Sequence, residues 1–304
     1  MSPNRLALGA IALWSTLAAL GVALAHVPPF LLTGCALVIG SAASWPRWRS
    51  WRVPPRTLAV GVYGLFGFHF LLFVALRNAP AVQANLVNYL WPLLIVVLAP
   101  VLLPATPLRA GHVVAAIVGF AGAALAILTG AGDAAQAATA AAPASSAALG
   151  YAAALGSAFI WATYSLLTRR LPAFPTSAVG LFGLVSGLLS LACHFALEPR
   201  ATIAAPDLAL IALAGIGPMG AAFFLWDRAM KDGDPRTIGL LSYLTPVAST
   251  ALLLTVTGSG LRATLALAAV MVVGSAMLGA HASRAFQAKL SVDPDSSTPG
   301  RSAP

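Results

Sequence analysis

The second half of this chain repeats the first half. Residues 84–93 read ANLVNYLWPL and residues 238–247 read IGLLSYLTPV, so both contain Tyr-Leu-x-Pro, 154 positions apart. Two further matches occur in the same order and at similar intervals: Leu108-Arg109 with Leu261-Arg262, and Trp14 with Trp161. The matches indicate an internal duplication. If each copy holds an odd number of membrane spans, the copies face opposite ways, as in many secondary transporters.

The composition predicts an all-α integral membrane protein. Hydrophobic residues make up 59% of the 304 residues and charged residues 8%, whereas soluble domains carry about 25% charged residues. A spanning helix needs about 20 mostly apolar residues. Ten segments meet this requirement, five in each copy, and we number them as spans 1 to 10: 5–25, 29–45, 57–77, 81–103, 111–130, 149–168, 177–197, 208–227, 237–257 and 263–283.

The basic residues predict the orientation of these spans. With the N-terminus inside, all but three of the 17 Lys and Arg residues lie on the cytoplasmic side, the exceptions being Arg77, Arg200 and Arg262. This bias is typical of short cytoplasmic loops, and it places both termini in the cytoplasm. The net charge of +9 could also indicate nucleic-acid binding. Because the basic residues lie in short loops between apolar runs, we expect no nucleic-acid partner.

The domain organisation follows from the spans. Residues 1–130 form the first five-helix repeat and residues 149–285 the second, inverted one. Residues 131–148 are rich in Ala and are expected to be an external linker. Residues 286–304, with several Asp, Ser and Pro residues, are expected to be a disordered cytoplasmic tail.

Two matched prolines are candidate hinges. Pro92 and Pro246 lie near the centres of spans 4 and 9, where a proline removes a backbone hydrogen bond and kinks the helix. Paired interruptions in the two halves of a transporter point to its binding site. The alternative is a pair of ordinary packing kinks, which are common in membrane helices.

Polar and aromatic residues surround these prolines. They are Asn85, Asn88, Tyr89 and Trp91 in span 4, and Tyr243 in span 9. In hydrocarbon such groups need partners, so we expect them to face the protein interior or a watery cavity. They are candidate substrate-binding residues. The alternative role for the two asparagines is to join helices by hydrogen bonds.

His69 is the only ionisable side chain well inside a span. An intramembrane ionisable residue is a functional candidate by default, and His69 could bind a carboxylate or titrate during transport. The alternative is a neutral imidazole that is satisfied by a neighbouring hydroxyl or carbonyl group.

Two matched tryptophans, Trp14 and Trp161, lie too deep in spans 1 and 6 to be interfacial anchors. Tyr164 follows Trp161 by one helical turn. Aromatic walls with a few polar groups suit aromatic ligands, and packing is the alternative role. Trp226 lies near the predicted end of span 8, so we interpret it as an interfacial anchor.

Several chemistries lack the residues that they need. No Asp or Glu lies deep in a predicted span, and Asp227 is placed at the end of span 8 beside Arg228. A mid-membrane charge costs about 2.5–3.5 kcal/mol, so its absence disfavours acid-driven cation efflux. Zinc-binding helix motifs, phosphate loops and nucleophile elbows are not found. We therefore expect no catalytic residues, no metal and no cofactor.

The pattern resembles the drug/metabolite transporter superfamily of EamA type. The resemblance rests on ten spans in two inverted repeats, a central Trp in an early span, and Asn-Tyr-Leu-Trp-Pro at residues 88–92. It covers residues 5–284 and implies one central cavity lined by spans 1, 3, 4, 6, 8 and 9. Within the superfamily, Phe68-His69, residues 85–92, and Trp161 with Tyr164 are similar to exporters of aromatic amino acids.

This resemblance implies a function. We expect a monomeric secondary transporter that exports aromatic and hydrophobic amino acids across the bacterial inner membrane by alternating access. The alternative within transport is a multidrug or other metabolite exporter. The alternative from another class is a membrane-embedded lipid-modifying enzyme, for which the chain shows no nucleophile or acid.

Overall fold

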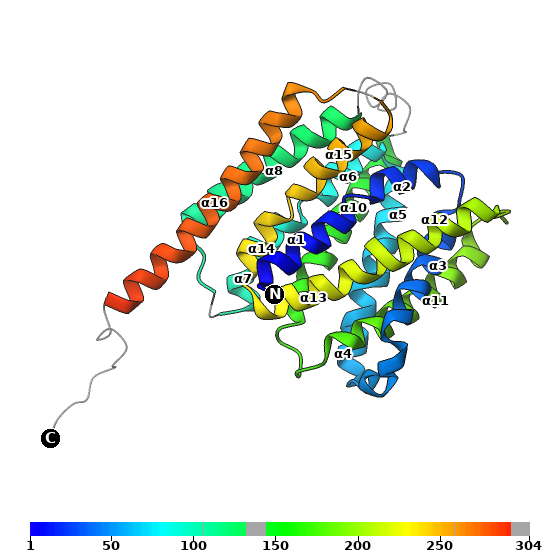
Figure 1. Cartoon of the computed structure of the whole chain (residues 1–304), viewed down its shortest axis with the longest axis horizontal. Coiled ribbons are helices and arrows are strands. Elements are labelled where there is room, and N and C mark those ends of the chain that lie inside the picture. The colour runs from blue at the N-terminus through cyan, green and yellow to red at the C-terminus, as the bar shows by residue number, and fades with distance from the viewer. Residues whose placement is uncertain (105, 132–143, 259, 293–304) are drawn as a thin grey trace.

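The computed structural model describes residues 1–104, 106–131, 144–258 and 260–292, and this part of the chain forms a helical bundle (Figure 1). Ten helical stretches within it are long and apolar enough to cross a membrane: Pro3–Ala23, Pro29–Trp51, Pro55–Asn78, Ala81–Leu102, Ala110–Ala131, Ser146–Leu167, Thr176–Leu197, Ala205–Asp232, Pro235–Val256 and Ala263–Ser283. The predicted all-α fold and its ten spans are confirmed, with every boundary within six residues of its predicted place.

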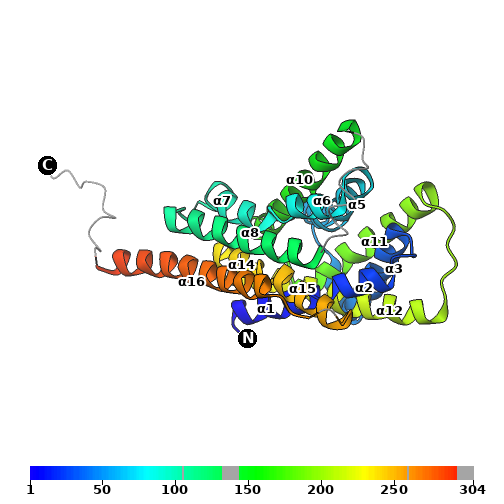
Figure 2. The same ribbon diagram turned by 90° about the horizontal axis from the view of Figure 1, so that it is seen from above.

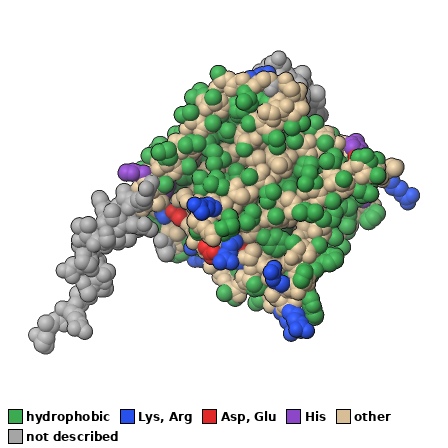
Figure 3. All heavy atoms as spheres, viewed as in Figure 1, with side chains coloured by type: hydrophobic (Ala, Val, Ile, Leu, Met, Phe, Trp, Pro, Cys, Tyr) green, Lys and Arg blue, Asp and Glu red, His purple; other side chains and the backbone are tan. Residues whose placement is uncertain are grey.

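The surface of the bundle fits a bilayer. Figure 3 shows apolar side chains over most of the visible face, with Lys and Arg gathered mainly along its lower edge. Large apolar side chains such as Val101, Phe195 and Met277 are between 67% and 82% exposed. In water such a surface would favour aggregation, whereas in a membrane it contacts lipid chains.

Prolines begin many of the helices. α1 (Pro3–Trp14), α3 (Pro29–Ser41), α4 (Pro55–Val62) and α14 (Pro235–Leu241) each start at a proline. A proline at this position has a backbone angle that suits the helix, and the N–H that it lacks would have no helical partner there. The prolines that punctuate the sequence therefore fix where the spans begin.

Spans 4 and 9 are both interrupted next to their central proline. Span 4 consists of α6 (Ala81–Asn88) and α7 (Trp91–Leu102), and span 9 consists of α14 and α15 (Leu244–Val256). A proline cannot donate the regular helical hydrogen bond. The chain tightens there instead: the N–H of Leu90 donates to the carbonyl of Val87 at 3.1 Å, and Thr245 donates to Ser242 at 3.0 Å.

Spans 3 and 8 each contain one turn of π-helix. In span 3, η2 (Tyr63–Gly67) joins α4 to α5 (Phe68–Asn78). In span 8, η4 (Gly217–Ala221) joins α12 (Ala205–Ile216) to α13 (Ala222–Asp232). The two π-turns start 154 positions apart, the same interval that separates Tyr89 from Tyr243. Because π-turns are rare, this coincidence supports a duplicated unit.

The remaining elements pack in matching pairs. α8 (Ala110–Ala131) lies beside α16 (Ala263–Val292), and α3 lies beside α11 (Val179–Leu197), as Figures 1 and 2 show. α10 (Ala144–Leu167) packs on α5 of span 3, and α1 packs on α13 of span 8. These last two pairs correspond to each other. α10 and α5 belong to spans 6 and 3, and α1 and α13 belong to their counterparts in the other half, spans 1 and 8. The shorter elements are α2 (Leu17–Ala23), η1 (Ala42–Trp51) and η3 (Thr176–Ala178).

Two predicted segments are covered in part. Of the predicted linker, residues 132–143 lie outside the described residues, and α10 already begins at Ala144. Of the predicted tail, residues 293–304 lie outside the described residues, while α16 continues to Val292.

Glycine lets α3 approach its neighbours closely. A Cβ atom on Gly40 would lie 2.7 Å from the carbonyl oxygen of Gly215 and from the Cα of Gly220. On the other side of α3, a Cβ on Gly187 of α11 would lie 2.9 Å from the carbonyl oxygen of Gly34. These neighbours are backbone atoms, which cannot turn aside as a side chain can. Small residues at such contacts hold membrane helices together.

We predict that Gly40→Val destabilises the protein by about 1–3 kcal/mol, the usual cost of overpacking a well-packed contact. Thermal unfolding of the purified protein in detergent measures the change. Gly274→Ala is the control, because a Cβ there meets nothing within 4 Å. Equal melting temperatures for Gly40→Val and the wild type would show that this contact does not hold α3 in place.

Candidate functional site

An aromatic cluster lies inside the bundle, centred on Trp161 of α10. We define it as Trp14, Phe68, Trp91, Trp161, Tyr164, Phe223 and Trp226. The ring centroids of the other six members lie between 5.4 and 6.4 Å from that of Trp161. These distances are typical of favourable edge-to-face and offset contacts. The cluster therefore joins side chains from spans 1, 3, 4, 6 and 8.

Four tryptophans form the buried part of this cluster. Trp14, Trp91, Trp161 and Trp226 are each at most 9% exposed. Trp226 lies 5.2 Å from Trp14 and 5.6 Å from Trp91, measured between ring centroids. Trp14 donates its indole N–H to the carbonyl of Pro218 at 3.0 Å, and Trp226 donates to the hydroxyl of Ser165 at 3.0 Å. The rings are thus fixed in position as well as buried.

His69 on α5 packs against the edge of the aromatic cluster. Its ring lies 5.0 Å from Phe68 and 6.4 Å from Phe223, and the residue is 8% exposed. Nδ1 lies 2.6 Å from the carbonyl oxygen of Leu65, so Nδ1 carries a proton and donates it. In the neutral ring Nε2 is then an acceptor. Nδ1 of His69 therefore makes its hydrogen bond within span 3, as expected for a neutral imidazole that is satisfied by a neighbouring carbonyl group. Nε2 can still accept a hydrogen bond from another donor.

The two asparagines of α6 differ in their surroundings. Asn88 is 5% exposed, and its Oδ1 accepts a hydrogen bond of 2.7 Å from Ser157 of α10. It therefore joins two helices. Asn85, one turn earlier, is half-buried, and its side chain makes no hydrogen bond with the described residues. Tyr89 is also half-buried. The side chains of Asn85 in α6 and of Tyr89, which follows α6, are thus not tied to another helix by a hydrogen bond within the described residues.

Tyr243 lies apart from the aromatic cluster. It is fully buried and packs against Phe120 of α8, at 6.5 Å between ring centroids. Its neighbours are apolar residues of α8, α15 and α16. Its predicted neighbour Pro246 is buried in α15, and Pro92 is buried in α7, where its carbonyl approaches Gly239 of α14. Span 9 thus contacts span 4 at Pro92, through α14.

Four residues in or beside the aromatic cluster were not among the predicted binding residues: Phe68, Phe223, Trp226 and Ser157. Trp226 was interpreted as an interfacial anchor, but it is 1% exposed, because span 8 continues to Asp232 and the ring lies deeper than expected. Phe223 lies three positions before Trp226 and on the same face of α13. Phe223 is also the repeat counterpart of His69, 154 positions on, and this match could have identified it. No sequence feature singles out Ser157.

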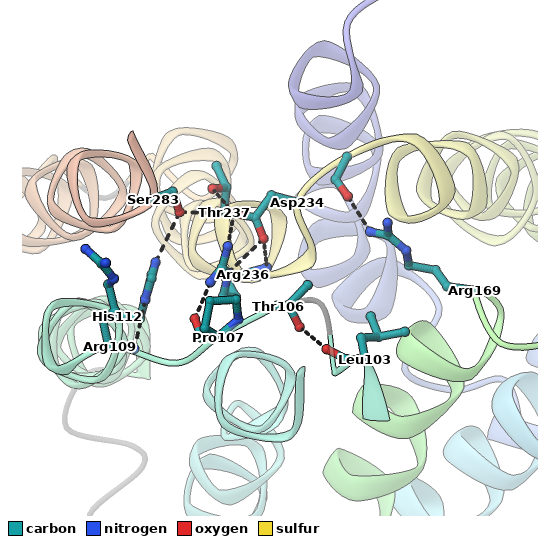
Figure 4. Close-up of polar contacts among 11 residues, drawn as sticks. Leu103, Thr106, Pro107, Arg109, His112, Arg169, Asp234, Arg236, Thr237 and Ser283 are labelled. Carbon is teal, nitrogen blue, oxygen red and sulfur yellow. Dashed lines mark hydrogen bonds and ion pairs between the residues drawn. The ribbon is translucent and has the colours of Figure 1, made fainter. Parts of the chain in front are cut away.

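Polar contacts tie four segments together at one end of the bundle (Figure 4). Arg236 of α14 donates to Oδ1 of Asp234 at 3.0 Å and also to the carbonyl of Pro107. Ser283 of α16 donates to Oδ2 of Asp234 at 3.0 Å, and its hydroxyl lies 3.1 Å from Nε2 of His112 on α8. Among the described residues, no group of three or more His, Cys, Asp and Glu could hold a metal ion.

The charge of Arg236 controls the protonation of Asp234. Burial raises the pKa of the Asp234 carboxyl, but the hydrogen bonds and the positive charge of Arg236 outweigh burial, so its pKa lies below its ordinary value. A lowered pKa in the folded state means that the contribution to stability is complete above the unfolded-state pKa of about 3.9 and is lost as the pH falls through the folded-state pKa.

We predict that Asp234→Asn lowers the free energy of unfolding by about 1–3 kcal/mol at pH 7, because it breaks a charged hydrogen-bond network. The difference from the wild type should shrink as the pH falls below about 4. Melting temperatures of both proteins between pH 3 and pH 8 measure it. A difference that is constant over this range would contradict the assignment.

A bundle of ten apolar spans around buried aromatic rings defines a class of protein, the multi-spanning membrane proteins. The chain belongs to the EamA-like transporter family, whose model matches residues 3–128 and 148–279. It is 40% identical over 285 residues to the aromatic amino acid exporter YddG of Ancylobacter novellus, covering 88% of this chain and 93% of that protein.

Two other comparisons also find similar proteins. The chain is 27% identical over 281 residues to the aromatic amino acid exporter YddG of Salmonella typhimurium, covering 88% of this chain and 92% of that protein. A solved crystal structure superposes with a TM-score of 0.84 at 37% identity, covering 93% of this chain and 98% of that one. The two segments that match the family model coincide with the two halves predicted from the internal repeat.

Proposed function

We propose that this protein is a secondary transporter of the bacterial inner membrane that exports aromatic and other hydrophobic amino acids by alternating access. The observation that carries the proposal is the aromatic cluster, in which rings from five spans meet inside the membrane domain. The family and the names of the two relatives support it. No covalent chemistry is part of the proposal.

The chemistry of the cluster suits an amino acid with a ring. Indole and phenol rings offer faces and edges to an aromatic side chain, and each such contact is worth about 0.5–1.5 kcal/mol beyond burial. Nε2 of His69 supplies a polar group beside the rings. Asn85 and Tyr89 lie on span 4, which contributes Trp91 to the cluster. The proposed substrate is neutral overall, and none of the seven residues of the aromatic cluster carries a charge.

The position of the cluster supports a state in which the cytoplasmic side is closed. Trp161 lies six residues before the end of α10, and Trp226 lies six residues before the end of α13, so both are about 9 Å from those ends. With both termini in the cytoplasm, these helix ends are cytoplasmic. The packed rings then close the cytoplasmic side, and substrate uptake requires them to separate.

The interrupted helices offer a way to separate them. Spans 4 and 9 lack regular helical hydrogen bonds beside Pro92 and Pro246, so bending there breaks few contacts. We propose that the two halves are inverted copies and that they rock about these breaks. In transporters built from inverted repeats, such motion exposes one central site to each side in turn.

We predict that Trp161→Ala lowers the rate of phenylalanine counterflow into proteoliposomes about tenfold, because a loss of about 1.4 kcal/mol of binding is a tenfold change. His69→Ala should also lower it. Both variants should remain monodisperse in detergent. Trp48→Ala and His281→Ala are the matched controls, because these two side chains are exposed.

The same assay discriminates the alternatives. Competition by phenylalanine, threonine and methyl viologen, each with and without a pH gradient, separates amino acid export from drug export and tests proton coupling. Wild-type rates in both Trp161→Ala and His69→Ala would show that the aromatic cluster is not the binding site. Competition by methyl viologen alone would overturn the assignment to amino acids.

A further inference from the structure

We propose that Asp227 and Lys231 form a headgroup subsite at the cytoplasmic end of the aromatic cluster. There Asp227 binds the ammonium group and Lys231 the carboxylate of a zwitterionic amino acid, in exchange for the ion pair that the two residues make with each other. The inference rests on the proposed function and names the residues that recognise the charged end of the substrate.

The ion pair is buried and incompletely satisfied. Nζ of Lys231 lies 2.7 Å from Oδ2 of Asp227, and the side chains are 18% and 1% exposed. The other carboxylate oxygen, Oδ1, is buried and has no hydrogen-bond partner in the part of the chain that the structure describes. A buried acceptor without a partner is destabilising, because it has lost its hydrogen bonds to water. An ammonium group carries three donors and can satisfy Oδ1.

The pair lies next to the rings that would hold the substrate side chain. Asp227 directly follows Trp226 on α13, and its carboxylate lies close enough to Tyr164 of the aromatic cluster for the two groups to interact electrostatically. The ammonium and carboxylate of an amino acid are joined to its ring by a short aliphatic segment. A ring in the cluster and a headgroup at α13 can therefore belong to one molecule.

The fold does not need this pair for packing. At the 154-residue interval, the counterpart of Asp227 is Phe73 and that of Lys231 is Arg77. Phe73 fills its position by packing against Phe30, at 5.1 Å between ring centroids. An apolar residue thus occupies the position in span 3 that Asp227 occupies in span 8. A buried ion pair in general stabilises a protein no more than good apolar packing does.

The same two residues hold a segment across the cytoplasmic end of the cluster. We call residues 168–176, between α10 and η3, the strap. Thr176 donates to Oδ2 of Asp227 at 2.7 Å, and Lys231 donates to the carbonyl of Phe174 at 3.1 Å. Nζ of Lys231 also lies 3.4 Å from the centre of the Phe174 ring. Exchange of the ion pair for a substrate headgroup would weaken these contacts together.

A third contact fixes the strap at its other end. Arg169 donates to the carbonyl of Gly233 at 2.5 Å (Figure 4). This contact involves neither Asp227 nor Lys231, so the strap can loosen at Phe174 and Thr176 while it stays attached at Arg169. A substrate that takes both partners of the ion pair would thereby open a path from the cytoplasm to the rings. A ligand with only one of the two charges would not.

The test uses ligands that lack one charge. Phenylalanine, phenylalaninamide (no carboxylate) and 3-phenylpropionate (no ammonium) compete against labelled phenylalanine in proteoliposome counterflow. We expect Lys231→Gln to weaken phenylalanine at least tenfold and to leave phenylalaninamide unchanged. We expect Asp227→Asn to weaken phenylalanine and phenylalaninamide and to leave 3-phenylpropionate unchanged. Thermal stabilisation of the purified protein by each ligand gives the same comparison without transport.

The matched control is a second ion pair on the same helix. Arg228 and Asp232 have the same four-residue spacing and lie 2.5 Å apart, but their side chains are 62% and 46% exposed. Arg228→Gln and Asp232→Asn make the same charge changes and should alter no preference. If Asp227→Asn and Lys231→Gln weaken all three ligands equally, the pair only holds the strap and the subsite is refuted.

If the variants of Asp227 and Lys231 fail to fold, the proposal can still be tested on a protein that keeps both residues. With Cys35 and Cys193 replaced by Ala, Phe174→Cys places a reporter at a buried residue of the strap. Maleimide labelling should accelerate with phenylalanine and not with either analogue. Equal labelling under all conditions would contradict the exchange. If the wild type does not transport phenylalanine at all, the proposed function fails, whatever the variants do.

Discussion

Trp14 and Trp161 occupy equivalent places in the two halves of the chain, and their rings meet 5.7 Å apart. His69 and its counterpart Phe223 also meet, at 6.4 Å. Equivalent residues would contact each other in this way if a two-fold axis related two inverted copies, as proposed above. The proposed relation would also pair α8 with α16 and α3 with α11, which pack together. The aromatic cluster is one of the places where the two halves meet, so the positions of its rings depend on both halves.

The membrane interior explains how the backbone around this junction is arranged. A helix that is interrupted in hydrocarbon must satisfy its backbone groups in some other way. The carbonyl of Leu65 in one π-turn accepts from His69, and the carbonyl of Pro218 in the other accepts from Trp14. π-turns frequently occur at functional sites. Here they orient two of the side chains that were predicted to bind the substrate.

The sequence predicted the parts of the structure that depend on position along a helix. Hydropathy located the ten spans, and the internal repeat identified Trp14 and Trp161. The sequence does not show how each helix is rotated about its own axis, because that rotation depends on packing against other helices. Tyr243 was therefore grouped with residues that it does not contact. Asp227 was placed beside Arg228, whereas the helix turns it inward to Lys231, four residues on, a spacing that brings side chains together.

The account depends most on two copies that are oppositely oriented, because only then does a two-fold axis lie in the membrane plane and bring Trp14 to Trp161. Leu108 and Leu261 are equivalent residues in the loops before α8 and α16, and single cysteines at these sites test the orientation directly. A membrane-impermeant maleimide applied to intact spheroplasts should label the cysteine at position 261 and not that at position 108. Labelling of both from the same side would contradict the inverted arrangement and the transport proposal that rests on it.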